Sequence, residues 1–412
     1  MKPRVLVTDG HFRKTLAAVR SLGQKGVHVT VGERTFLNTS FFSKYCAQRL
    51  VYPSPRQAPD QFIEFFVKEI KRNRYDCLFP MEEETLLPLV KYHSDISRYT
   101  YLLSPDGKKI EFTRDERNLM QFAETHGIPT PKTFRIAPEP FKVEGSRTSN
   151  EAEDRSASGS LTNLTRVVGE IPIPAVIKPR ISSGSLGIVY VKKREDLLSS
   201  YRRVHEQFPF PIVQEWIPDG GGTYGLSALF DEASNVKAAF VHKKLRMFPV
   251  QGGPSTLGEG VEHPQIMESG LSLLRSLNWV GVGMAEFKID PRDGIPKLME
   301  VNPRFWGSLQ LAIVSGVDFP YLMLRMARGE RFSPILRYAV GKRFRWLLLG
   351  DILHFLKNPN RFHLDPSFFH FFDPHTCYDV FSKDDPLPFL GSVATLFTFL
   401  YDPEMKRFLE RR

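Results

Sequence analysis

The 412-residue chain lacks several features that would place a protein in a class at once. Its three cysteines, Cys46, Cys77 and Cys377, are odd in number, far apart and without metal-type spacing, which is typical of a reduced, cytoplasmic protein. The longest apolar runs, such as residues 391–402, are too short or too interrupted to span a bilayer. The N-terminus shows no apolar signal segment, so we expect a cytoplasmic location.

A sustained basic run is also absent, although the formal net charge is +10. Lysine and arginine are scattered and no RNA-binding aromatic signature accompanies them, so a mildly basic, solvated surface is favoured over a nucleic-acid interface. A content of 42% apolar and 25% charged residues excludes wholesale disorder. The length predicts about two to four domains, and we find no internal repeat.

Residues 1–112 contain no GxGxxG fingerprint after their first strand-like segment, so we expect no dinucleotide site there. Strand patterns alternate with helical spacing, which predicts a doubly wound parallel sheet. The expected strands are 5–10, 27–33, 77–85 and 100–105, with a helix over 11–23. Asp9, His11 and Glu82 fall at strand ends, where they either line a ligand crevice or form ordinary turns.

The remaining chain changes character three times. Residues 113–126 predict a helix that Thr113 and Glu116 begin as a capping box. Residues 146–160 have almost no apolar side chain and predict a solvated loop or insertion. Beyond residue 331, segments rich in Phe, Trp and Leu predict helices separated by irregular stretches. Their aromatics either pack a helical extension onto the main body or form a membrane or partner surface.

The segment 283–301 predicts a β-hairpin with a Pro-Arg-Asp-Gly turn. Pairing that is symmetric about Asp293 puts Glu286 opposite Glu300, and two facing carboxylates repel unless a cation lies between them. Mg²⁺ suits such a pair because it takes few protein carboxylates and completes its shell with phosphate oxygens and water. Asn302 adds a neutral oxygen and Arg304 a planar fork for phosphate or carboxylate. A solvent-facing strand edge is the alternative.

A second candidate is Lys178, at a strand end ahead of a Ser/Gly loop over 181–187. Serine and glycine let backbone N–H groups approach phosphate oxygens closely. No GK[ST] follows the glycines, which excludes a Walker A loop. A plain hairpin turn explains the segment equally well.

Two further segments carry suitable side chains. An apolar strand ends at Gln214-Glu215-Trp216, where backbone groups and one acid would meet an adenine edge, and Asp219 would accept ribose hydroxyls. A tight turn is the alternative. Residues 242–247 then place Lys244 and Arg246 on one face of a strand and Lys243 on the other, and such cations would neutralise phosphate charge.

The order of these pieces resembles the ATP-grasp superfamily, over roughly residues 113–330. The resemblance implies an antiparallel, two-lobed ATP-grasp domain behind the N-terminal parallel sheet, with ATP and Mg²⁺ (or Mn²⁺) as cofactors. It implies Glu286, Glu300 and Asn302 as metal ligands, and Arg304, Lys244 and Arg246 as catalytic cations. The implied ATP-binding residues are Arg117, Lys178, Ser183, Gly184, Ser185, Gly187, Gln214, Glu215, Trp216, Ile217, Asp219 and Lys243. At Asp115-Glu116-Arg117 the sequence departs from the more usual Asp-Lys.

The resemblance also implies a domain division and an activity. The domains would be residues 1–112, 113–330 (small lobe about 130–215) and a mainly helical extension over 331–412. The activity would be a carboxylate–amine ligase that phosphorylates a carboxylate and couples it to an amine, with an amino acid or small peptide-like acid as substrate. A phosphotransferase of the same fold, or a non-catalytic ATP-binding module, is the alternative. No nucleic-acid partner is expected, while a homodimer or peripheral docking through the C-terminal region stays open.

Overall fold

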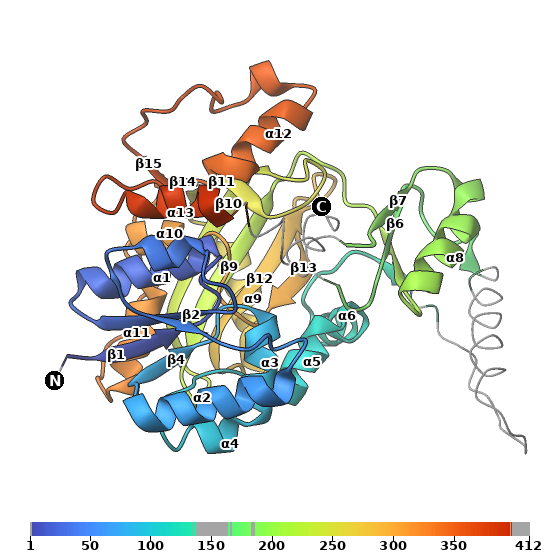
Figure 1. Cartoon of the computed structure of the whole chain (residues 1–412). Coiled ribbons are helices and arrows are strands. Elements are labelled where there is room, and N and C mark those ends of the chain that lie inside the picture. The colour runs from blue at the N-terminus through green and yellow to red at the C-terminus, as the bar shows by residue number, and fades with distance from the viewer. Residues whose placement is uncertain are drawn as a thin grey trace, which may run out of the picture. The chain divides into compact units, whose positions relative to one another are not determined.

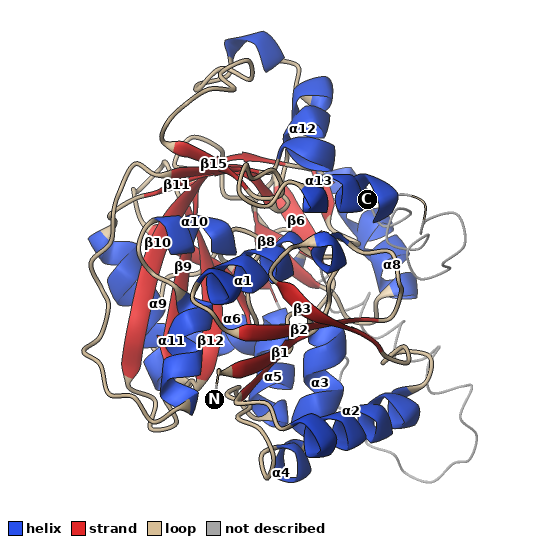
Figure 2. Cartoon of the chain, turned by 60° about the vertical axis from the view of Figure 1, so that its left-hand side comes forward, coloured by secondary structure: helices blue, strands red, loops and turns tan. Residues whose placement is uncertain are grey.

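The computed structural model describes residues 2–134, 136, 164, 167–182, 186–395 and 397. Within these residues the chain forms a parallel sheet and two further sheets, with helices between the strands (Figure 2). This is the mixed α/β class that the strand and helix patterns predict. The predicted insertion at 146–160 lies outside the described residues. No helix among those described is long and apolar enough to cross a membrane.

The N-terminal parallel sheet has the strand order β3-β2-β1-β4. Its elements are β1 (Arg4–Val7), α1 (Arg13–Gln24), β2 (His28–Glu33), β3 (Cys46–Val51), α2 (Pro59–Asn73) and β4 (Cys77–Phe79). The expected strand over 100–105 is reduced to a single bridge between Tyr101 and Cys77. The prediction of a strand there was wrong in extent, because Pro105 has no N–H to continue a ladder.

Alternation along β1 covers both faces of this sheet with helices. Val5 and Val7 pack in the core that contains Ala17 and Val19 of α1. Leu6 points the other way, into the core that contains Phe62 of α2. Both views show α1 and α2 on opposite faces of the sheet (Figures 1 and 2). This is the doubly wound arrangement that the sequence predicts.

A seven-stranded sheet has the order β13-β12-β9-β10-β11-β14-β15. Its strands are β9 (Thr223–Phe230), β10 (Val236–Met247), β11 (Ser255–Gly260), β12 (Gly281–Ile289), β13 (Pro296–Asn302), β14 (Arg343–Arg345) and β15 (Thr376–Tyr378). β9, β10, β11 and β14 pair antiparallel in turn, whereas β14 and β15 pair in parallel. Two short strands in the region expected to be mainly helical therefore join this sheet.

A smaller antiparallel sheet has the order β5-β8-β6-β7. Its strands are β5 (Thr133–Phe134), β6 (Ala175–Lys178), β7 (Val189–Val191) and β8 (Ile212–Glu215). Leu197 and Tyr201 of α8 (Leu197–Gln207) pack with Ile177 and Val213 to form its core.

The remaining helices connect these sheets along the chain. They are α3 (Glu83–Lys91), α4 (His93–Ile96), α5 (Gly107–Arg114), α6 (Glu116–Thr125), α9 (Pro264–Ser276), α10 (Leu309–Val314), α11 (Phe319–Ala327), α12 (Ile352–Lys357) and α13 (Leu387–Thr395). The segment Leu347–Asp351, which is kinked by non-helical backbone at Leu348 and Leu349, precedes α12.

The chain divides into two compact units. Unit 1 comprises Met1–Ile110, Thr223–Glu286 and Val301–Arg412, and unit 2 comprises Glu111–Gly222 and Phe287–Glu300. The division falls within β12, after Glu286, and within β13, after Glu300. The three-domain division made from the sequence stays a prediction.

Candidate functional site

The hairpin expected around Asp293 is present, since β12 and β13 are neighbouring strands. Its turn is closed by the N–H of Asp290, which donates to Ile295 O at 3.1 Å. Gly294 adopts a φ of +72°, a conformation that glycine accommodates without strain. Glu286 therefore lies on one strand of this hairpin, and Glu300 and Asn302 lie on the other.

In unit 1, Lys244 of β10 reaches Glu286 of β12. Lys244 Nζ lies 2.6 Å from Glu286 Oε2, and the two side chains are 8% and 15% exposed. Nζ also donates to Gly253 O at 3.2 Å. The sequence placed both residues at the reacting phosphate, and the structure brings these two together.

Arg246 has a different neighbourhood from Lys244, contrary to the expected shared face. The pairing of β10 with β11 shifts register between Lys244 and Arg246, so the period of two breaks there. The Arg246 side chain is 3% exposed, and its Nε and Nη2 donate to Asp351 at 2.7 and 2.9 Å. Lys243 instead lies over the ring of Tyr224 at 5.7 Å.

Arg304 lies beside two acids of the N-terminal region. Its Nε is 3.3 Å from Glu82 Oε2 and 3.6 Å from Glu83 Oε1. The other oxygen of Glu82 is 2.8 Å from Lys14 Nζ. Lys14 and Arg304 also both donate to Phe305 O, at 2.9 and 3.0 Å. Two cations and two carboxylates therefore form one cluster in unit 1.

Burial shifts the titration of this cluster. Burial, followed by the charge of Arg304, lowers the pKa of Lys14 to about 8, while Glu82 opposes that change. Burial alone would raise the pKa of Glu82, but Lys14 and Arg304 together hold it below its ordinary value. Glu82 thus carries a negative charge near neutral pH, and Lys14 is closer to losing its proton than an exposed lysine.

Asp9, for which the sequence allowed either a ligand crevice or an ordinary turn, forms hydrogen bonds within the protein. It follows β1 with a φ of +62°. Its Oδ2 accepts hydrogen bonds from the Thr85 hydroxyl at 2.7 Å and from the N–H of Glu82 at 2.9 Å. Burial and then the charge of Glu33 raise the pKa of Asp9 to about 6. The residue fixes the start of α3, where Glu82 and Glu83 lie.

In unit 2, Lys178 at the end of β6 pairs with Glu116. Its Nζ lies 3.2 Å from Glu116 Oε2. Burial raises the pKa of Glu116, Lys178 opposes the rise, and Glu300 adds to it, so these three charges lie within electrostatic range. Asp115, not Thr113, caps α6 through the N–H of Arg117, because Thr113 lies inside α5. Asp115 also pairs with Arg180.

The expected phosphate loop is described only in part. Ser183, Gly184 and Ser185 lie outside the described residues. Gly187 has a φ of +75°, and a Cβ there would lie 2.7 Å from a carbon of Phe208. This position therefore requires glycine for backbone and space alike.

The hinge segment combines a buried strand end with exposed polar groups. Gln214 is 1% exposed and donates to the Thr133 hydroxyl, and Ile217 is 2% exposed. Glu215 accepts the N–H of Lys132 at 2.9 Å and pairs with Arg292 at 3.0 Å. Asp219 is 85% exposed and pairs with Lys288, which lies 6.0 Å from the ring centre of Trp216. The side chains of Glu215 and Asp219 thus have protein partners. Gln214 and Glu215 are the last residues of β8, and Trp216 and Ile217 follow it.

Comparison with known proteins gives a consistent picture. A family model described as "ATP-grasp in the biosynthetic pathway with Ter operon" matches residues 250–346. The structure of a biotin carboxylase from Campylobacter jejuni covers 83% of this chain, and 74% of that chain is covered, with a TM-score of 0.64 and 14% identity. Residues 250–346 therefore match an ATP-grasp family model, and the fold of the chain resembles that of this biotin carboxylase.

Two further solved structures have a similar fold. An L-amino acid ligase from Bacillus licheniformis matches with a TM-score of 0.55 and 16% identity, covering 79% of this chain and 74% of that one. An N5-carboxyaminoimidazole ribonucleotide synthetase from Thermotoga maritima matches with a TM-score of 0.53 and 17% identity. The match covers 83% of this chain and 79% of that one. At these identities the likeness establishes the fold.

Among curated sequences, the carbamoyl phosphate synthase large chain of Mycobacterium sp. (strain JLS) is 23% identical over 206 residues. The match covers 48% of this chain but 18% of that protein. The chain therefore spans less than a fifth of the length of this curated relative.

Lys14 and Glu83 are the members of the Arg304 cluster that the sequence patterns did not single out. Lys14 lies in the first turn of α1, the helix that follows β1, and its side chain is 3% exposed. A lysine in the first turn of a helix that follows a buried strand of a parallel sheet is a usable signal, because ligands bind at the carboxyl ends of such strands.

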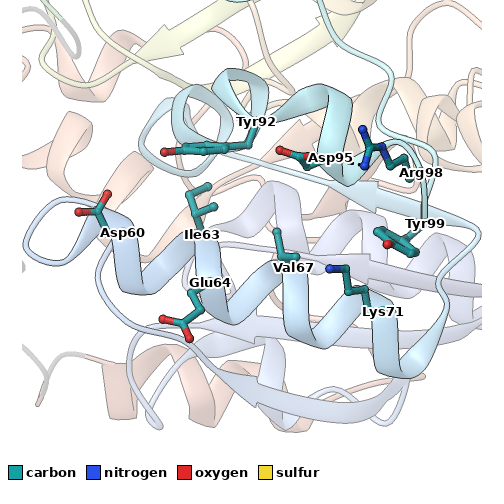
Figure 3. Close-up of a pocket in the computed structure, with 9 residues that line it drawn as sticks. All are labelled: Asp60, Ile63, Glu64, Val67, Lys71, Tyr92, Asp95, Arg98 and Tyr99. Atoms are coloured by element: carbon teal, nitrogen blue, oxygen red, sulfur yellow. Dashed lines mark ion pairs between the residues drawn. The ribbon is translucent and has the colours of Figure 1, made fainter.

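A cavity of about 470 Å³ lies apart from all predicted site residues, between α2 and the segment around α4 (Figure 3). Its charged groups are partly neutralised locally, since Arg98 pairs with Asp95 at 3.8 Å and Lys71 lies over the ring of Tyr99 at 5.2 Å. Its charge is mixed and no chemistry-bearing cluster lines it.

Proposed function

We propose that the protein is an ATP-dependent ligase that phosphorylates a substrate carboxylate and couples it to an amine, releasing ADP and phosphate. The observation that carries the proposal is the ion pair between Lys244 of β10 and Glu286 of β12, whose side chains are both little exposed. Arg304, two residues after the end of β13, contacts Glu82 and Glu83 in the same unit. The superfamily fold and its C–N ligase relatives support the reaction class.

The oxygen set on the hairpin fits Mg²⁺. Glu286, Glu300 and Asn302 offer two carboxylates and an amide, which are hard oxygen ligands, and Mg²⁺ fills its remaining positions with phosphate oxygens and water. The described residues contain no group of three or more His, Cys, Asp or Glu suited to hold a metal by themselves. A Mg²⁺–ATP site needs none, because the nucleotide supplies ligands of its own. Bound Mg²⁺ would draw charge from the γ-phosphoryl group.

We assign the ATP-binding roles as follows. Lys178 contacts the phosphates, with Gly187 and the loop of Ser183, Gly184 and Ser185 covering them. Arg117 and Lys243 add positive charge. The backbone of Gln214, Glu215, Trp216 and Ile217 meets the adenine, and Asp219 meets the ribose. These assignments agree with the position of Lys178 at the end of β6 and the hinge after β8.

The chemistry proceeds in two balanced steps. A carboxylate oxygen of the substrate bonds to the γ-phosphorus while the bond to the ADP oxygen breaks, giving an acyl-phosphate. The amine nitrogen then bonds to the acyl carbon, the bond to the phosphate oxygen breaks, and the nitrogen loses a proton as phosphate leaves. Arg304 and Lys244 stabilise the negative charge that develops during transfer. Arg246 stays a predicted contributor whose guanidinium is held by Asp351.

The test is ADP release in the presence of Mg²⁺, ATP and panels of carboxylates and amines. We expect Glu286→Gln and Lys178→Ala each to lower carboxylate-dependent ADP release about 10³-fold, because each removes charge that stabilises phosphoryl transfer. The matched controls are Glu268→Gln in unit 1 and Lys193→Ala in unit 2, both at exposed positions.

The products separate the alternatives. Mass spectrometry of a ligase reaction finds the amine incorporated through a C–N bond, whereas a phosphotransferase leaves a stable phosphate ester. Full turnover in both active-site variants, or nucleotide binding without turnover across the panel, contradicts the proposal.

A further inference from the structure

The start of α6 is fixed against the end of β6, and both elements belong to unit 2. The N–H of Glu116, the first residue of α6, donates to Arg180 O at 2.8 Å. Asp115, which caps the helix, pairs with the guanidinium group of Arg180. Lys178 is the last residue of β6, and its Nζ lies 3.2 Å from Glu116 Oε2. The joined ends of α6 and β6 therefore hold the carboxylate of Glu116 beside Lys178.

The carboxylate of Glu116 is not needed to join these two elements. The contacts between α6 and β6 at Arg180 use the backbone of Glu116 and the side chain of Asp115. The capping bond of α6 also comes from Asp115, which accepts the N–H of Arg117 at 3.0 Å. What the side chain of Glu116 adds is a negative charge beside Lys178, so its role concerns that lysine.

The charge of Lys178 is neutralised in a poorly screened place. The side chains of Lys178 and Glu116 are 9% and 15% exposed, so water weakens their interaction little. Within the part of the chain that the structure describes, Glu116 is the one carboxylate that forms an ion pair with Lys178. Asp115, itself paired with Arg180, and Glu300 add negative charge within electrostatic range of Glu116. Lys178 therefore meets an arriving anion with its charge already neutralised.

A phosphate group that binds Lys178 comes close to this carboxylate. The ammonium group has three donors, so it can contact phosphate and Glu116 together, but the phosphate oxygens then face a like charge. With an effective dielectric constant of about 20, two like charges about 5 Å apart change a binding constant tenfold or more. Mg²⁺ on the phosphates offsets the repulsion, because it cancels two of their negative charges. The carboxylate should therefore disfavour metal-free nucleotide more than nucleotide that carries Mg²⁺.

We infer that Glu116 competes with the nucleotide phosphates for Lys178 and thereby makes the site selective for the Mg²⁺ complex over the metal-free nucleotide. The inference rests on the proposed function, which places the phosphates of ATP on Lys178. It adds a specificity-determining residue that has no part in the ATP contacts assigned above. A site with this selectivity is not blocked by free ATP, which lacks the metal that phosphoryl transfer uses.

The first arm of the test measures the Kd of ADP by isothermal titration calorimetry at pH 8, with EDTA and with excess Mg²⁺. We expect Glu116→Gln to lower the Kd of metal-free ADP about tenfold and that of Mg²⁺–ADP less than about threefold. Adenosine has no phosphate and should bind parent and variant equally. An unchanged or higher Kd for metal-free ADP in the variant overturns the inference, and so does a gain that adenosine shares.

The matched control is Glu111→Gln, at an exposed position of α5 in the same unit, which should keep the affinities of the parent chain. Glu116→Ala is the second variant, because it removes the carboxylate without adding an amide that could bind phosphate. We expect it to tighten the binding of metal-free ADP as Glu116→Gln does. If it weakens that binding instead, the carboxylate holds Lys178 in place for phosphate, and the inference is wrong.

This inference and the proposed function fail in different ways. If the parent chain binds no ADP even with Mg²⁺, the nucleotide site of the proposed function falls, and the role of Glu116 falls with it. If Lys178→Ala weakens the binding of Mg²⁺–ADP but Glu116→Gln changes no affinity, only the role of Glu116 is wrong. If the variants shift ADP binding as expected while no carboxylate stimulates ADP release, the ligase reaction is wrong and the selectivity stands.

Discussion

Arg304 and Arg246 both follow from the sequence as catalytic cations, yet their surroundings differ. Arg246 and its partner Asp351 are 3% and 0% exposed, and Asp351 also accepts Arg345 at 2.7 Å. Arg304 is 18% exposed, with contacts to two glutamates at 3.3 and 3.6 Å. A substrate can replace the partners of Arg304 in a partly open cluster. Replacing Asp351 would strand a fully buried carboxylate, so burial makes Arg246 harder than Arg304 to release to a substrate.

The largest effect should come from Arg304. We expect Arg304→Ala to lower kcat about 10³-fold, because the cation at a transferring phosphoryl group acts mainly in the transition state. Because the change leaves Glu82 and Glu83 less well neutralised at positions only 18–19% exposed, the free energy of unfolding in urea should also fall, by about 1–3 kcal/mol. Steady-state kinetics and urea unfolding measure the two quantities. Arg331→Ala, at an exposed position of unit 1, serves as the control. Near-normal kcat would remove Arg304 from its proposed role.

Asp351 should show the opposite balance of effects. Asp351→Ala leaves Arg246 and Arg345 unpaired, and it should reduce the free energy of unfolding by about 3–5 kcal/mol. Urea unfolding measures this loss, with Asp365→Ala, at an exposed position of the same segment, as the control. If stability is retained while activity collapses, the comparison breaks, and Arg246 acts in catalysis instead of holding the fold.

His242, which is also buried, should have a smaller effect on stability, and that effect should depend on pH. The residue is 1% exposed and contacts the Ser308 hydroxyl at 3.1 Å. Burial, followed by the charge of Lys244, lowers its pKa from 6.5 to about 3. Below pH 6.5 the unfolded chain therefore binds a proton that the folded chain does not, and stability falls as pH drops.

The size of this effect can be measured with His242→Gln. Because of His242, the free energy of unfolding of the parent chain should be about 2 kcal/mol lower at pH 5 than at pH 8. The variant should not show this part of the pH dependence. Unfolding in urea at both pH values provides the comparison. The same pH dependence in the variant and the parent chain would show that His242 does not titrate as its burial requires.

Much of the fold follows from local patterns in the sequence. The buried, apolar β1, β2 and β4 and the amphipathic α1 predict the doubly wound sheet. β3 escaped prediction because its residues alternate between intermediate and exposed, as expected of an edge strand. β14 and β15 are three residues each, and their pairing depends on partners far along the chain.

The candidate site divides in the same way. The hairpin that carries Glu286, Glu300 and Asn302 is a local feature, so spacing alone predicts it. The register shift beside Arg246 cannot be recognised from the sequence, because the sequence argument assumes a regular alternation of side chains along the strand. The contact between Lys14 and Glu82 joins residues on separate elements of the sheet domain, and only the tertiary structure reveals it.

The central claim is that the γ-phosphoryl group of ATP moves to a carboxylate oxygen of the substrate. It is tested most directly with an amino acid that carries ¹⁸O in its carboxylate, turned over with ATP, Mg²⁺ and an amine. The account predicts that each phosphate released contains one ¹⁸O atom from the acid and that ADP contains none. Unlabelled phosphate released alongside the coupled product would contradict it.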